Sequence, residues 1–179
     1  MIHMSLNVPY SLFGILAQPK TLFLTGIMSI ALTLVFVAVM KVWGFVVIDE
    51  MFHREAILEH IQAMTLDQRR AHQILTGTVD VLYPFVYTAF FVGVFQRWLG
   101  SRWKFIAILA ATMVIPLDLL EGISQISLLS GSLDLLELKL VVTPFKLALY
   151  SPILIAALSI LACVGFRKIT KADEKPPEV

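Results

Sequence analysis

Charged residues are scarce in this chain. Asp, Glu, Lys and Arg make up 15% of its 179 residues, whereas 58% are hydrophobic. Soluble domains carry about 25% charged residues, so this composition excludes an ordinary soluble protein and predicts a membrane protein whose main partner is the lipid bilayer. The formal net charge is only +1. Without a strongly positive balance, there is no reason to expect nucleic acid as a partner.

Cysteine is almost absent, since Cys163 is the only one. A lone thiol excludes an intramolecular disulfide and a redox relay between two cysteines. The histidines His53, His60 and His72 lack the HExxH spacing or any comparable spacing of metal ligands. The chain also lacks a glycine-rich phosphate loop and a nucleophile elbow. We therefore expect neither a metal site nor a cofactor.

Long apolar runs, in contrast, dominate the chain. Four of them are long enough to cross a bilayer, which takes about 20 apolar residues. They lie at about 21–43, 79–97, 104–129 and 141–166. They predict an all-α fold, a bundle of four transmembrane helices that forms a single membrane domain over residues 1–170. The polar end with two prolines, residues 171–179, is expected to be a disordered cytoplasmic tail.

The loop between the first two spans, residues 49–78, is predicted to contain short amphipathic helices. Apolar residues recur over 57–64 with the spacing of one helix face. Thr65 and Gln68 have the spacing of a capping box, which would begin a second short helix. Gly77 is expected to end that helix before the second span.

The basic residues predict the orientation of the chain in the membrane. If both termini are cytoplasmic, eight of the counted Lys and Arg residues lie inside and five outside. The outer five are Lys41, Arg54, Arg69, Arg70 and Lys139. Cytoplasmic loops carry the excess of basic residues, so we expect both termini in the cytoplasm and the helical loop outside.

Two acids interrupt the third apolar run, because Asp118 and Glu121 lie within the segment VIPLDLLEGISQ. A carboxylate near the middle of a membrane costs roughly 2.5–3.5 kcal/mol on insertion scales, so acids at this depth indicate a functional site. Residues three apart share a helix face. The two carboxyl groups must therefore share a partner, a proton or a water-filled cavity.

Other polar residues fall in the same outer half of the predicted bundle. They are Asp80 and Tyr87 in the second span, Gln125 in the third and Lys146 in the fourth. Three acids then face one or two lysines, depending on whether Lys41 takes part. At least one carboxyl must hold a proton, bind a cation or contact water. This surplus favours a polar cavity, and the alternative is ion pairing that only sets the helix order.

The polar positions follow three short motifs. These are D-x3-P-x2-Y (Asp80, Pro84, Tyr87), P-x-D-x2-E (Pro116, Asp118, Glu121) and T-x2-K (Thr143, Lys146). The pattern resembles that of a family of small bacterial four-span integral membrane proteins whose function is uncharacterised. The resemblance covers roughly residues 45–150 and implies a bacterial inner-membrane protein without implying a reaction. Gly122 stands where that family usually has Asn.

These features lead to one main hypothesis and two alternatives. The main one is a multi-pass membrane protein with an outward-facing polar pocket of acids and lysine that binds a small or lipidic ligand, a proton or a cation. The first alternative is an intramembrane enzyme that acts on a lipid or isoprenoid, with Asp118 or Glu121 as the proton carrier. The second is a structural or assembly subunit of a larger membrane complex. A homo-oligomer is a further partner to test.

Overall fold

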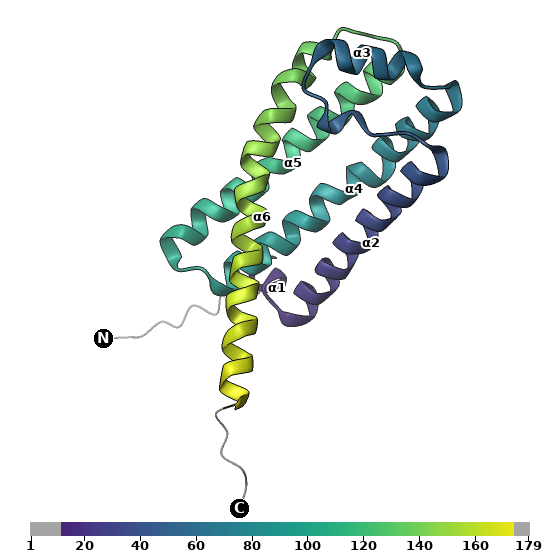
Figure 1. Cartoon of the computed structure of the whole chain (residues 1–179). Helices are drawn as coiled ribbons and strands as arrows, with labels where there is room; N and C mark the ends of the chain where they lie inside the picture. Colours follow the sequence, from purple (N-terminus) through teal and green to yellow (C-terminus); the bar gives the residue numbers. More distant parts are fainter. Residues whose placement is uncertain (1–11, 174–179) are drawn as a thin grey trace, which may run out of the picture.

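Helices account for nearly all of the described chain. A computed structural model describes residues 12–173, and this range contains no strand (Figure 1). The elements are α1 (Leu12–Leu16), α2 (Pro19–Trp43), the 3₁₀ helix η1 (Ile48–Glu50), α3 (Arg54–Ala63), α4 (Leu66–Trp98), α5 (Ser101–Leu129) and α6 (Leu136–Asp173). The expected all-α class is confirmed for these residues. Of the predicted tail, 171–173 continue α6 and 174–179 lie outside the described range, as do residues 1–11.

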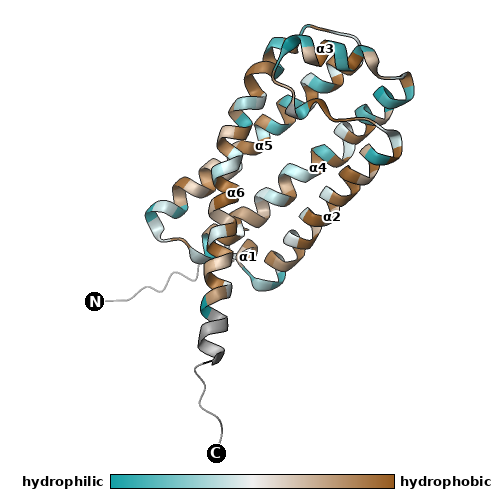
Figure 2. Cartoon of the chain, viewed as in Figure 1, coloured by the Kyte–Doolittle hydropathy of each residue, from teal (hydrophilic) through white to brown (hydrophobic). Residues whose placement is uncertain are grey.

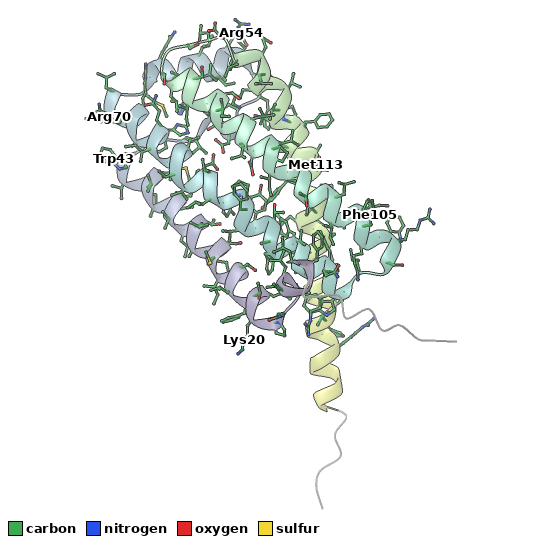
Figure 3. All side chains as sticks on the ribbon, turned by 180° about the vertical axis from the view of Figure 1, so that it is seen from behind. Lys20, Trp43, Arg54, Arg70, Phe105 and Met113 are labelled. Atoms are coloured by element: carbon green, nitrogen blue, oxygen red, sulfur yellow. The ribbon has the colours of Figure 1, made fainter. Side chains whose placement is uncertain are left out.

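Four helices in the described range are long and apolar enough to cross a membrane: α2, α4, α5 and the part of α6 from Leu136 to Arg167. Figure 2 shows hydrophobic residues along most of their length, with hydrophilic residues gathered in α3 and near it. Phe105 and Met113 project from α5 away from the other helices (Figure 3) and are 70% and 48% exposed. Such apolar surface has no place in water, so these helices are those of a multi-pass membrane protein.

Local sequence signals set the two ends of α2. Pro19 occupies the first turn, where its missing N–H costs no hydrogen bond and its fixed φ suits the helix. Gly44 follows the last residue with φ +64, and its N–H donates to the carbonyl of Met40. That left-handed cap favours glycine because other side chains are strained there. The chain then turns back across the end of the helices toward α3.

The second span differs from its prediction. We expected a separate short helix ending at Gly77, but α4 continues without a break from Leu66 to Trp98. The predicted capping box at its start is present, with the Thr65 and Gln68 side chains each bonded to the other's backbone N–H. Glycine within a helix costs only about 1 kcal/mol relative to alanine. Burial of Ala71 and Leu75 on the preceding turns offsets that cost.

The helix α4 lies at the centre of the arrangement. It packs against α2, α5 and α6, and α5 also packs against α6, whereas α2 makes little contact with α6 (Figures 1 and 3). The central helix is also the most buried of the three. In the most apolar stretch of each helix, 44% of α4 is buried, against 6% of α2 and 11% of α6. The α2 helix is therefore held mainly by α4.

Two apolar clusters form the core. The distal core, far from α3, contains Phe91, Phe95, Val114 and Ala157. The cap core, under α3, contains Phe45, Ile48, Ile57, Leu75 and Leu128. Along α4, α5 and α6 the polar residues fall between these two clusters. The polar region therefore has apolar packing on both sides.

The contact of α1 with α4 makes a prediction about Gly93. A Cβ at this position would overlap the carbonyl oxygen of Leu16 and lie 2.7 Å from Cδ2 of Leu22. Gly93→Ala should therefore destabilise the protein by about 1–3 kcal/mol, the usual cost of overpacking. Thermal unfolding in detergent measures the change. The matched control is Gly165→Ala, where a Cβ meets nothing within 4 Å, and equal melting temperatures for the two variants would contradict the packing.

Candidate functional site: a polar cavity among α2, α4, α5 and α6

A lysine of α6 binds both acids of α5. Nζ of Lys146 lies 2.8 Å from Oδ1 of Asp118 and also contacts the carboxylate of Glu121. The three side chains are 14%, 11% and 2% exposed. Asp118 and Glu121 thus share one cation, which the three-residue spacing on α5 allows. Removing these charges from water is costly, and the shared ammonium group offsets part of that cost.

Hydrogen bonds extend this ion pair in both directions. On one side, the hydroxyl of Tyr87 donates to the carboxylate of Asp118. On the other, the hydroxyl of Thr143 donates to Glu121 and accepts from Nζ of Lys139 at 3.2 Å. Side chains of α4, α5 and α6 are thereby joined in one network.

The network ends at the connection between α2 and α3. Nζ of Lys139 donates to the carbonyl oxygen of Met51 at 2.8 Å. Lys139 is completely buried, although from the sequence we predicted only that it lies on the outer side of the membrane. Its position could have revealed it, because Lys139, Thr143 and Lys146 have the i, i+4, i+7 spacing of one helix face. Lys41, the other lysine considered for the cluster, is exposed at the end of α2 and takes no part in the network.

A cavity of about 280 Å³ lies beside the network. Its polar lining comprises Thr33, Asp49, Asp80, Tyr83, Tyr87, Asp118, Lys146 and Tyr150. Its apolar lining comprises Phe36, Val37 and Met40 of α2, Val47, and Leu147 of α6. All four long helices and the connection after α2 contribute to this wall. A concave, largely apolar space with a few convergent polar groups is the usual form of a ligand site.

The structure places the predicted residues in two groups. Asp80, Tyr87, Asp118 and Lys146 line the cavity. Glu121 and Gln125 do not line it and are both buried. Glu121 belongs to the hydrogen-bonded network, whereas both polar atoms of the Gln125 amide are buried without a hydrogen-bond partner among the described side chains.

Asp49 is a lining residue that the sequence did not single out. It lies on η1, outside the spans, where a polar residue normally faces water. Burial raises the pKa of its carboxyl from 3.8 to about 6, the charge of Glu121 acts in the same direction, and Lys146 opposes both. The only sequence signal was its place directly after the apolar segment Phe45–Ile48.

The charges at the cavity do not balance. Lys146 engages Asp118 and Glu121, while neither Asp49 nor Asp80 forms an ion pair with a described side chain. Both of these carboxyl groups line the cavity. The acidic surplus inferred from the sequence therefore lies at the cavity wall. A chemical partner for this wall is a cation or a hydrogen-bond donor.

Comparison of the chain with family models, with curated proteins and with solved structures finds no match. The function of the cavity must therefore be inferred from the residues that line it.

Asp49 makes the stability of the protein depend on pH. Its carboxyl is neutral in both states below its ordinary pKa of 3.8, but between 3.8 and about 6 the unfolded chain ionises while the buried carboxyl resists. Its contribution to stability is therefore lost as the pH rises through this window and stays absent above it. Asp49→Asn has no carboxyl to ionise and so does not lose this stability. The melting temperature of Asp49→Asn minus that of wild type should therefore increase as the pH rises from 3.8 to about 6 and stay constant above that.

Thermal unfolding in detergent from about pH 4 to about pH 8 tests this expectation. The matched control is Glu59→Gln, which neutralises an exposed acid of α3. A constant difference between Asp49→Asn and wild type over the whole range would contradict a buried Asp49.

Proposed function

We propose that the protein is a four-helix membrane bundle whose polar cavity binds an amphiphile with a cationic, amine-type head group. The resemblance to bacterial four-span proteins supports an inner-membrane location. The excess of basic residues at the two termini and the α4–α5 turn supports cytoplasmic ends. In that orientation the cavity lies in the outer half of the bilayer, and the connection between α2 and α3 lies at its outer end.

One observation carries the proposal: Asp49 and Asp80 line the same cavity without a basic partner. Both residues are partly buried, and a carboxylate with little water around it is stable only when a charge or hydrogen bonds compensate it. An ammonium group supplies both, with three donors and a positive charge. The apolar wall formed by Phe36, Val37 and Met40 suits the hydrocarbon part of the same molecule.

The size and donor geometry favour an organic cation over a metal ion. The cavity volume of about 280 Å³ is near the lower end of the roughly 300–1,000 Å³ typical of ligand pockets. Among the side chains that the structure describes, no three from His, Cys, Asp or Glu converge as metal ligands. A head group with its first few carbons fills such a space better than a single ion.

The same contacts favour binding over acid–base catalysis. Asp118 and Glu121, the proton carriers of the enzyme hypothesis, are both engaged by Lys146 and by a donated hydroxyl. A general acid or base must reach its substrate and exchange a proton with it. Charges that served only to assemble a larger complex would need no cavity beside them. Binding therefore explains more of the geometry than either alternative.

Equilibrium binding of radiolabelled dodecylamine to the protein in lipid nanodiscs tests the proposal. We expect saturable binding at one site, with Asp80→Asn weakening it at least about tenfold, or 1.4 kcal/mol, because one counter-charge is lost. Asp67→Asn, which neutralises an exposed acid at the start of α4, is the matched control and should bind as wild type does. Equal competition by unlabelled dodecanol, which has the same chain without the charge, would contradict a cationic site.

A further inference from the structure

We propose that the ligand enters the cavity sideways from the bilayer, through an opening between α2 and α6. This inference rests on the proposed function, because it concerns the route to the same cavity. It also defines the ligand class more closely, as a membrane-dissolved amine with a single alkyl chain. The chain stays between α2 and α6 while the amine reaches the carboxylates.

The two helices that border the opening both line the cavity without packing on each other. Thr33 and Val37 come from α2, and Leu147 and Tyr150 come from α6. Contacts between α2 and α6 are sparse, as the separated ribbons in Figures 1 and 3 illustrate. Val37 is 37% exposed although it lines the cavity. Val37 therefore connects the wall of the cavity with the exposed surface of α2.

The end of the cavity near α3 is closed by the segment 44–53, which we call the cover. Side chains hold its backbone carbonyls in place. Nε2 of Gln68 donates to the carbonyl oxygen of Gly44 at 2.9 Å, and the His60 ring lies 2.9 Å from that of Val46. Lys139 bonds the carbonyl oxygen of Met51 as described above. Ile48 is completely buried in the cap core and anchors the middle of the cover.

Of the helices that line the cavity, α2 is the one that can be displaced most easily. Only 6% of its most apolar stretch is buried, so its displacement would expose little core. The hydroxyls of Thr33 and Tyr83 lie 2.9 Å apart and join α2 to α4 beside the opening. Both residues line the cavity. A hydrocarbon chain between α2 and α6 therefore displaces mainly lipid contacts of α2, while its packing on α4 can be kept.

The volume of the cavity supports the same route. A space of about 280 Å³ holds a head group and the start of a chain, but not a whole lipid. The rest of the chain must remain outside, and an alkyl chain is stable in lipid but not in water. An opening toward the bilayer lets the amine reach the carboxylates while the alkyl chain stays in lipid. An opening through the cover would place the chain in water.

Reversible crosslinking tests the route. In a Cys163→Ser background, Val37→Cys and Leu147→Cys are joined by a short, reducible, bifunctional thiol reagent that bridges the opening. We expect the association rate of dodecylamine in nanodiscs to fall at least tenfold on linking and to recover on reduction. The matched control joins Val46→Cys to His60→Cys across the cover, and its link should leave the rate unchanged.

Two outcomes separate the route from the proposed function. If linking the cover slows association while linking α2 to α6 does not, entry from the bilayer is wrong and binding stands. If wild type binds no dodecylamine, the proposed function itself fails.

A second measurement needs no cysteine variant. Dodecylamine with a photoreactive diazirine at the end of its chain is bound to wild type, and the adducts are mapped by peptide mass spectrometry. Adducts on α2 near Thr33 and on α6 near Tyr150 would support the route, and adducts confined to the cover or α3 would overturn it.

Discussion

The ion pair of Lys146 with Asp118 and Glu121 is the interaction on which the rest of this structure depends. It places one positive charge between two negative charges in a setting with little water. The penalty for burying such charges is several kcal/mol per ion, and only close contact and further hydrogen bonds offset it. Tyr87 and Thr143 supply those bonds, from α4 and α6 respectively. This one lysine and its partners thereby join side chains of three helices.

The ion pair also determines which carboxyl groups at the cavity have no basic partner. Because Lys146 is used by the acids of α5, Asp49 and Asp80 have no basic partner of their own among the described side chains. Apolar clusters close both ends of the polar region. The loosely packed α2 leaves the side of the cavity toward α6 as its approach from lipid. A cationic head group and an alkyl chain complement these two features together.

The sequence predicted the helical class and the long apolar helices because hydrophobic run length directly reflects the thickness of a bilayer. It also predicted that Asp118, Lys146 and Asp80 lie at one level, since antiparallel spans of known length align their polar positions. It did not identify Asp49 as a residue of the cavity wall or Lys139 as buried. Both lie near the ends of the apolar runs, where a charged residue ordinarily meets water. Asp49 lies on a three-residue 3₁₀ helix, which is too short to show a periodic pattern. For Lys139 the one available signal was its helical spacing with Thr143 and Lys146.

The continuity of α4 through Gly77 was missed for a related reason. A single glycine weakens a helix in isolation, but packing of the turns on either side decides whether the helix continues. The cap core supplies that packing through Ala71 and Leu75. Local patterns thus located the long helices, whereas contacts between distant segments decided their ends and the membership of the polar network.

Equilibrium unfolding in mixed micelles tests the central role of Lys146 most directly. Removing the lysine alone, with Lys146→Met, leaves two buried carboxyl groups without their cation and should cost about 3–5 kcal/mol. The triple variant Lys146→Met/Asp118→Asn/Glu121→Gln removes all three charges and should recover most of that loss. The matched control is Lys20→Met, which changes an exposed lysine at the start of α2 and should cost little. If Lys146→Met costs no more than Lys20→Met, or if the triple variant is no more stable than Lys146→Met, the ion pair does not organise this structure.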